Sequence, residues 1–285
     1  MRRIKRNSSV FIAPSFFGVL LFFVLPFVKV IQYSMVDNPI NNEFVFLDNF
    51  QNVLHNGAFL KAVRNTFSFS VVAVPLAVVL SLFLAIMLES KLPFRSQFRT
   101  FFLSPMMVPV ASIVLIWQVL FHYNGAVNDL LMRFGGDKID WMKSEHSLVV
   151  IVLLFLWKNL GYNMILFMAA LASVPKDMIE VATLESASPV QIFFEIKIRY
   201  LSSTILFVTI MSLISSFKVF REIYLLTGDY PYDSIYMLQH FMNNKFKSLD
   251  YQTLSAAAIL MSIVMVIIIG ILFLAEDRFG KDVEG

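Results

Sequence analysis

The sequence contains no cysteine and few charged residues. Without cysteine, the chain has no disulfide framework, no cysteine-based metal site and no thiol nucleophile. Charged residues make up 15% of the 285 positions, whereas a soluble domain carries about 25%. The formal net charge is only +3, which argues against a nucleic-acid-binding face. Hydrophobic residues reach 58%, above the roughly 45–50% of soluble domains, so we expect much of the surface to face lipid.

Motifs for chemistry within the chain are also absent. The sequence has no G-x-x-x-x-G-K-[ST] phosphate loop, no H-E-x-x-H pair and no G-x-S-x-G elbow. No Asp or Glu falls inside a predicted span, so the proton relay of a secondary carrier is missing. We therefore predict a non-enzymatic chain with no catalytic residue and no metal site. Solvated or helix-capping side chains, rather than metal ligands, are expected at the four histidines, which are His55, His122, His146 and His240.

Long apolar runs are abundant. A helix needs about 20 apolar residues to cross the hydrocarbon core, and six segments reach or approach that length. We therefore predict an all-α polytopic membrane protein with six transmembrane helices. The first run is too long for a cleavable signal, so we expect it to remain as a membrane helix. Prolines inside the runs (Pro14, Pro26, Pro75, Pro105 and Pro109) are interpreted as kinks. The predicted spans are 10–31, 66–88, 103–121, 148–171, 201–217 and 254–275.

The distribution of Lys and Arg predicts the orientation, because cytoplasmic segments carry the excess. With the N-terminus inside, the inner segments hold 12 Lys and Arg in 61 residues, and the outer segments hold 7 in 93. We expect a multi-pass protein with both termini in the cytoplasm.

The predicted cytoplasmic segment 173–200 carries the most informative pattern. Pro175 is well placed to open a helix that has Glu180 near its positive end. Ser188 and Pro189 end this helix, and a second amphipathic helix then runs into the fifth span. A short helix on the membrane surface with small residues on one face is suited to a groove in a partner protein.

This segment resembles the EAA loop of ABC importer permeases, whose pattern is E-A-A, three residues, G, nine residues, I, one residue, L-P. Glu180, Val181 and Ala182 stand at E-A-A, Ser186 at the glycine, and Arg199 at the proline. Whether the turn at Ser186 needs a positive φ is left open, and the loss of proline predicts an unbroken second helix. The resemblance implies that an ATPase is coupled through Glu180, Ala182, Glu185, Ser186, Ala187 and Ser188.

Other stretches extend the resemblance to sugar-type permeases over nearly the whole chain. They include Leu47-Asp-Asn-Phe50, Trp157-Lys-Asn-Leu-Gly-Tyr-Asn163 and the stretch 217–228, whereas Thr227-Gly-Asp-Tyr-Pro231 departs from the usual T-G-G-G-P. The resemblance implies a type I ABC importer permease with an amphipathic cytoplasmic coupling helix. It implies one permease domain over 1–285, with an N-terminal span at 10–31, a core at about 62–275 and a coupling loop at 173–200.

The partners follow from the same resemblance. It implies that the chain forms half of the pore of an ATP-driven importer in a bacterial cell membrane. The expected partners are a second, usually different permease, two cytoplasmic ATPase domains, membrane lipid and an extracytoplasmic binding protein that delivers a sugar or oligosaccharide. ATP and Mg²⁺ then bind on the ATPase subunits and no cofactor binds in this chain. From the residues alone, a secondary carrier or channel for a small polar solute remains the alternative.

Polar residues in the fourth predicted span are the candidates for the substrate path. Lys158 lies about ten residues into the span, near the membrane midplane at about 1.5 Å per residue, where a cation marks a functional site by default. Asn159 and Asn163 lie four apart on one helical face, and Tyr162 offers a ring that stacks on a sugar. Gly161 permits a bend or a close helix approach. The alternative is that these groups bond between helices, with Lys158 paired to a carbonyl or a partner subunit's acid.

Overall fold

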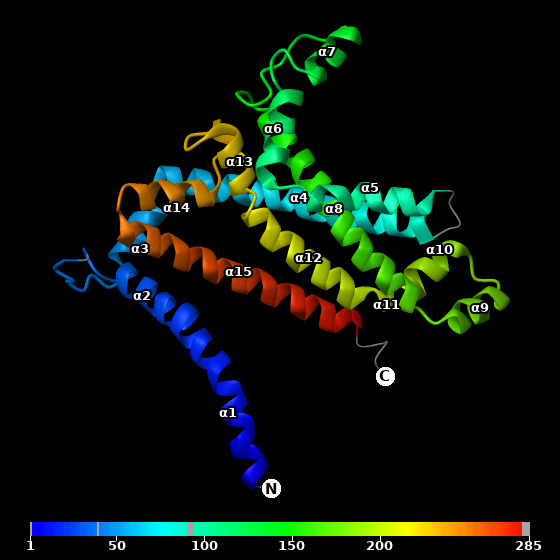
Figure 1. The fold of residues 1–285 in the computed structure, drawn as a ribbon, viewed down its shortest axis with the longest axis horizontal. Helices are drawn as coiled ribbons and strands as arrows, with labels where there is room; N and C mark the ends of the chain where they lie inside the picture. Colours follow the sequence, from blue (N-terminus) through cyan, green and yellow to red (C-terminus); the bar gives the residue numbers. More distant parts are fainter. Residues whose placement is uncertain (1, 39, 90–93, 281–285) are drawn as a thin grey trace. The chain divides into compact units, whose positions relative to one another are not determined.

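The computed structural model describes residues 2–38, 40–89 and 94–280, and this part of the chain is mainly helical (Figure 1). Residues 1, 39, 90–93 and 281–285, which include parts of the predicted inner segments, lie outside the described residues. The first helices are α1 (Arg2–Val19), a π-helical turn (Leu20–Val24), α2 (Leu25–Ser34), α3 (Asp48–Leu54), α4 (Gly57–Glu89), α5 (Arg95–Met107), α6 (Val110–Leu120), α7 (Ala126–Arg133) and α8 (Ser147–Ser173). They are followed by α9 (Lys176–Leu184), α10 (Pro189–Gln191), a π-helical turn (Ile192–Lys197), α11 (Ile198–Tyr200), α12 (Ser202–Phe217), α13 (Phe220–Thr227), a 3₁₀ turn (Asp233–Ile235), α14 (Leu238–Lys247) and α15 (Tyr251–Gly280).

The helices pack as two compact units. One comprises Met1–Leu60 and Phe241–Val266, and the other comprises Lys61–His240 and Ile267–Gly285. All candidate site residues of the sequence analysis belong to the second unit. The prediction of one permease domain over the whole chain stays a prediction.

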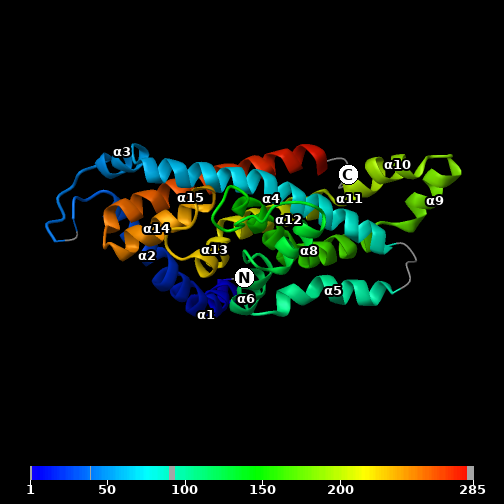
Figure 2. The ribbon, with the colours of Figure 1, turned by 90° about the horizontal axis from the view of Figure 1, so that it is seen from above.

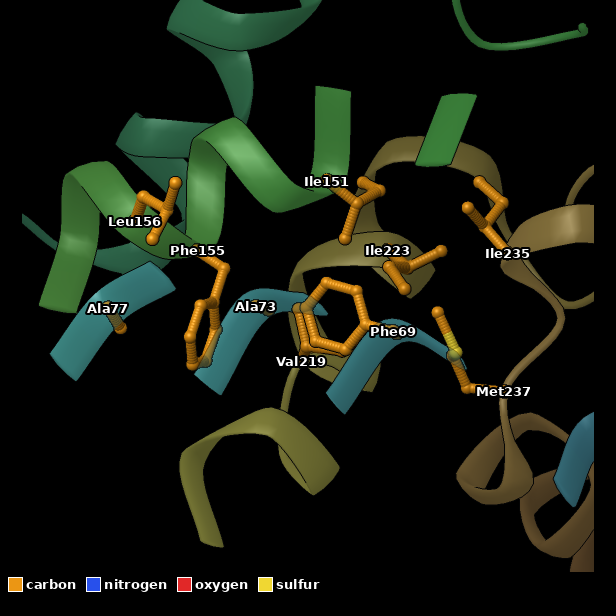
Figure 3. Close-up of a cluster of buried hydrophobic side chains, with 10 residues drawn as sticks. All are labelled: Phe69, Ala73, Ala77, Ile151, Phe155, Leu156, Val219, Ile223, Ile235 and Met237. Atoms are coloured by element: carbon orange, nitrogen blue, oxygen red, sulfur yellow. The ribbon is translucent and has the colours of Figure 1, made fainter. Parts of the chain in front are cut away.

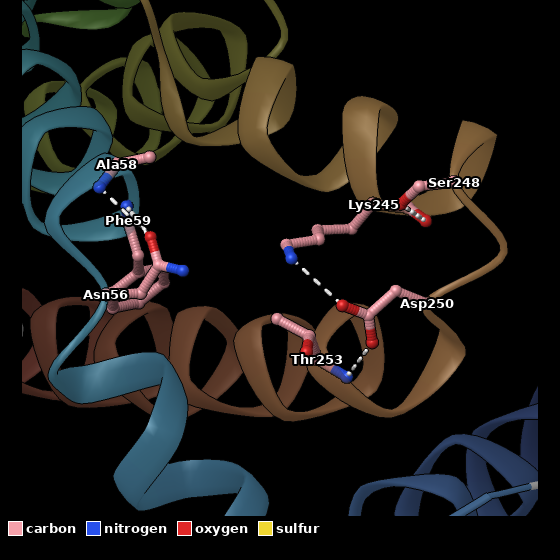
Figure 4. Close-up of polar contacts among 7 residues, drawn as sticks. All are labelled: Asn56, Ala58, Phe59, Lys245, Ser248, Asp250 and Thr253. Atoms are coloured by element: carbon pink, nitrogen blue, oxygen red, sulfur yellow. Dashed lines mark hydrogen bonds and ion pairs between the residues drawn. The ribbon is translucent and has the colours of Figure 1, made fainter.

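Polar side chains cap the N-termini of two helices in the first unit (Figure 4). The side-chain oxygen of Asn56 accepts hydrogen bonds from the Ala58 and Phe59 amides, which satisfies donors that the first turn of α4 leaves free. Asp250 does the same for α15 through the Thr253 amide, and it pairs with Lys245 at 2.9 Å. Burial works to raise the pKa of Asp250, but the bonds from Lys245 and Thr253 outweigh it and leave that pKa below its ordinary value.

One buried cluster of the second unit lies where α4, α8 and α13 meet (Figure 3). Phe69 of α4 packs edge-to-face on Phe155 of α8, with ring centroids 5.5 Å apart. Ala73 and Ala77 stand four apart on α4, so their small side chains let α8 approach that face closely. The other members of this buried cluster are Ile151, Leu156, Val219, Ile223, Ile235 and Met237.

Among the described residues, five helices are long and apolar enough to cross a membrane: Phe11–Ser34, Gly57–Glu89, Ser147–Ser173, Ser202–Thr227 and Tyr251–Asp277. These confirm five of the six predicted spans, with shifts at their ends.

The predicted span 103–121 is the exception, because α5 and α6 meet at an angle of 104°. Val108 is extended and Pro109 supplies no amide, so the helix ends there instead of kinking. Pro14, Pro75 and Pro105 lie inside helices, as predicted, and Pro26 is the second residue of α2. The predicted span 103–121 is therefore a pair of helices broken at Pro109, where only a kink was expected.

Candidate substrate site and coupling loop

Lys158 of α8 forms an ion pair with Glu222 of α13. The Glu222 side chain is buried, with 4% of its surface exposed, and that of Lys158 is 32% exposed. Helix α12 ends at Phe217 and α13 begins at Phe220, so the break between them directs Glu222 toward α8. The prediction that no acid lies inside a span is wrong at this residue, because the fifth span runs from Ser202 to Thr227.

A pocket of about 140 Å³ opens beside this ion pair. Lys158 and Asn159 are among its lining residues, together with polar side chains from the end of α12 and the start of α13. The polar lining residues are Lys158, Asn159, Ser215, Lys218, Arg221 and Glu222. The structure thus brings two of the four predicted path residues to one pocket and adds four that the sequence analysis did not select.

Asn163 and Tyr162 lie away from this pocket. Asn163 is buried, and its side-chain amide donates to the Ser212 hydroxyl of α12 at 3.0 Å. Asn159 donates to the Phe155 carbonyl of its own helix at 2.8 Å, and Tyr162 is half-buried. The alternative to substrate contact, a hydrogen bond between helices, is therefore present at Asn163. Direct substrate contact by these residues stays a prediction.

Gly161 is the point where α8 touches the backbone of α5. A Cβ added at Gly161 would lie 1.9 Å from the Phe102 carbonyl oxygen, far inside van der Waals contact. Helix α8 continues unbroken through this position, and Figure 2 shows α5 alongside it. Of the two roles predicted for Gly161, the structure shows close approach and no break in the helix.

The coupling loop has the predicted two helices. Helix α9 ends at Leu184, and Ser186 adopts a left-handed conformation with φ +64°. The Ala187 amide donates to the Ala182 carbonyl at 3.0 Å, the bond that closes a Schellman turn. Ser188 and Gln191 then form a capping box for α10. The turn therefore does need a positive φ, which the sequence analysis had left open.

The second helix of the loop is not broken at Arg199, as the replacement of the family's proline by arginine predicts. Helical backbone conformation continues from Pro189 through the π-helical turn and α11. Leu201 is also in the helical region, and its amide bonds to the Lys197 carbonyl just before α12 begins.

The loop's exposed apolar surface differs from the small-residue face that its sequence suggested. Helices α9 and α10 extend past the end of α8 (Figure 2). Ala182 and Ala187 are half-buried, whereas Glu180 and Glu185 are exposed. Leu184, which the sequence analysis passed over, has 85% of its surface exposed. Leu184 is therefore the most exposed of the large apolar side chains of α9.

His240 is a helix-capping side chain, one of the two roles expected for the histidines, but it is buried. It is fully buried against the rings of Phe220 and Tyr236, not solvated. Its Nδ1 accepts a hydrogen bond from the Met237 amide, which caps the start of α14. Burial lowers the pKa of His240 to about 4, against the opposing effect of the Asp229 charge. The imidazole is therefore neutral at physiological pH.

Replacing Ser186 with glycine is expected to stabilise the turn after α9, because glycine adopts a positive φ without the strain that a side chain brings. A gain of about 0.5–1 kcal/mol would slow hydrogen exchange at the 186 and 187 amides roughly two- to fivefold. The control is Ser188→Gly, which removes the capping box at a negative φ and should speed exchange. Faster exchange in Ser186→Gly would show that the turn does not populate this conformation.

Removing one member of the Lys158–Glu222 pair is expected to destabilise the protein more than removing both. Lys158→Met leaves a buried carboxylate unpaired, which costs about 3–5 kcal/mol, whereas an apolar pair of similar volume is close to neutral. The double variant Lys158→Met/Glu222→Leu should therefore recover most of the loss. Thermal unfolding of the wild type, both single variants and the double variant in detergent measures the coupling. Losses that simply add would mean that the two side chains do not interact.

The long apolar helices, the bent pair and the buried polar contacts between α4, α8 and α12 define a multi-pass helical membrane protein. The chain belongs to the family described as "Binding-protein-dependent transport system inner membrane component", whose profile matches residues 77–283. This confirms the resemblance found in the sequence.

Characterised relatives extend over most of the chain. The chain is 30% identical to the trehalose/maltose transport system permease protein MalF of Thermococcus litoralis, over 95% of this chain and 93% of that protein. It is 29% identical to the arabinooligosaccharides transport system permease protein AraP of Bacillus subtilis, over 78% and 72%. It is also 29% identical to the sn-glycerol-3-phosphate transport system permease protein UgpA of Escherichia coli, over 72% and 71%.

A solved structure has the same fold. It is a chain of a bacterial ABC transporter involved in the import of the acidic polysaccharide alginate, with a TM-score of 0.84 and 19% identity. The match covers 97% of this chain and 98% of that one. The predicted all-α importer-permease fold is confirmed.

Proposed function

We propose that this chain is a permease subunit of an ATP-driven importer and forms half of the pore for a sugar or oligosaccharide. The observation that carries the proposal is the membership of a binding-protein-dependent transport family, with relatives named for trehalose, maltose and arabinooligosaccharides. In this proposal the whole chain acts as one permease domain with a core at about 62–275. The second permease, which need not be identical, completes the pore, and an extracytoplasmic binding protein delivers the cargo.

The coupling role is assigned to the loop 173–200. In the proposal, Glu180, Ala182, Glu185, Ser186, Ala187 and Ser188 contact an ATPase subunit, which binds ATP and Mg²⁺. The exposure of Glu180 and Glu185 and the 85% exposure of Leu184 support this role, because they leave α9 available to a partner. The substrate path runs past Lys158, Asn159, Tyr162 and Asn163.

Uptake by the reconstituted complex tests the proposal. The two permeases, the ATPase and the binding protein are placed in liposomes, and labelled oligosaccharides are offered with ATP or with a non-hydrolysable analogue. Uptake that needs both ATP hydrolysis and the binding protein supports the proposal. Equal uptake with the analogue, or no uptake of any carbohydrate, contradicts it.

The proposed orientation places both termini in the cytoplasm of a bacterial cell and the loop after α7 outside. Asp137 is exposed in that loop, so a cysteine introduced there should react with a membrane-impermeant maleimide on intact cells. A cysteine at Asp177 on α9, also exposed, is the control and should react only after permeabilisation. The native chain has no cysteine, so no background labelling arises from it. The reverse pattern would overturn the orientation.

A further inference from the structure

The pocket beside the Lys158–Glu222 pair has an excess of positive charge. Lys158, Lys218 and Arg221 line it with one carboxylate, Glu222, so its net charge is +2. Glu222 is already engaged by Lys158. Among the described residues no carboxylate pairs with Lys218 or Arg221, and both of these residues are exposed. The two cations therefore remain available to a ligand that enters the pocket.

The position of Lys218 and Arg221 within a span indicates what kind of ligand the pocket takes. Lys218 and Arg221 stand at the break between α12 and α13, inside the apolar span Ser202–Thr227. Cations within a membrane span are expensive unless they meet an opposite charge. A neutral sugar requires only hydrogen-bond partners, which Asn159 and Ser215 supply, and it does not compensate two additional cations.

We infer that this pocket binds an anionic group of the cargo, so that the importer carries an acidic carbohydrate bearing a carboxylate or phosphate. The inference rests on the proposed function and adds the substrate class. Arg221 offers the planar set of donors that fits a carboxylate or phosphate, and Lys218 adds a point charge. The pocket's volume of about 140 Å³ is smaller than the roughly 300–1,000 Å³ of complete small-molecule sites. It holds one charged unit of the cargo, and the partner permease lines the remainder of the path.

The test compares acidic and neutral cargo in the same reconstituted importer. The probes are a labelled oligouronide and the same oligosaccharide with its carboxylates reduced to alcohols, and a hexose phosphate with its free hexose. The first pair reports on carboxylate recognition and the second on phosphate recognition. We expect ATP-dependent uptake of the acidic member of at least one pair to exceed that of its neutral partner at least tenfold. Preferential uptake of the neutral sugars would overturn the inference and leave the proposed function standing, whereas no uptake of any probe would contradict both.

Variants then locate the selectivity in the pocket. The double variant Lys218→Gln/Arg221→Gln should lower the ratio of acidic to neutral uptake at least tenfold. Arg95→Gln on α5, which removes an exposed cation outside the pocket, is the control and should leave that ratio unchanged. An equal fall in uptake of both probes would assign the two cations to structure and overturn the inference. Loss of the second permease on co-purification would also overturn it, because the cations would then pair with that subunit.

Discussion

Replacing Gly161 with alanine is expected to destabilise the folded chain strongly. The added methyl would lie 1.9 Å from the Phe102 carbonyl oxygen of α5, an atom of the backbone that cannot rotate away. Overpacking a core costs about 1–3 kcal/mol even where side chains can yield, and this contact is with backbone. We expect a loss at or above the top of that range, seen as a lower thermal midpoint and a lower yield of monodisperse protein in detergent.

The control for this prediction is Gly270→Ala in α15. Nothing lies within 4 Å of a Cβ at Gly270, and alanine favours a helix by about 1 kcal/mol over glycine. That variant should match or exceed wild-type stability. Equal stability of the two variants would show that α5 and α8 are farther apart than the structure places them.

Replacing Leu184 with arginine is expected to abolish ATP-driven transport while the chain still folds and inserts. Leu184 is 85% exposed at the end of α9, so its replacement disturbs little packing within the chain. In the proposed complex the residue enters a groove of the ATPase, where a long unpaired charge would be both too large and poorly solvated. We expect the affinity for the ATPase to fall at least tenfold, measured by co-purification alongside uptake.

Leu130→Arg on α7 is the matched control, because Leu130 is also exposed but lies in the loop assigned to the outside. It should retain the ATPase. Wild-type retention and uptake in Leu184→Arg would mean that α9 is an ordinary connector and would remove the main support for coupling through this loop.

The spans were predictable because apolar length is a local property of the sequence. Five of the six predicted runs are single helical spans. The sixth run is the bent pair α5 and α6, and its break was not predicted. Pro105 and Pro109 look alike in the sequence, yet Pro105 lies inside α5 and Pro109 is the N-cap of α6. Which proline ends a helix depends on how the freed backbone groups are satisfied by neighbouring segments, and one sequence does not show that packing.

The site was predicted at Lys158 but not at its partner. The fifth span was predicted to end at Phe217, since Lys218 and Arg221 interrupt its hydrophobicity, and Glu222 was therefore counted as part of a loop. A signal for the longer span was present in the residue type at Gly228, because glycine commonly follows the last residue of a helix, and here it follows α13 with φ +80°. Which residues of α8 touch the cargo stays a prediction.

The coupling loop 173–200 was predicted only in part. The sequence predicted two helices and the start of the second at Ser188 and Pro189, because the turn between them is local, but it placed the end of the first helix at Ser188, beyond the end of α9 at Leu184. It did not predict the left-handed conformation of Ser186, since serine at the glycine position carries no such signal. It also did not predict the exposure of Leu184, which depends on where the rest of the fold lies.

The ion pair between Lys158 and Glu222 also sets an order of events during biosynthesis. The two residues are 64 positions apart, so at about 5–20 residues per second the ribosome makes Lys158 roughly 3–13 s before its partner. Throughout that interval the fourth span holds a lysine that costs about 2.5–3.5 kcal/mol at the centre of a membrane helix. The apolar residues of α8 must offset this cost alone until the fifth span arrives. A nascent chain that stops before Glu222 therefore leaves an uncompensated cation in the bilayer.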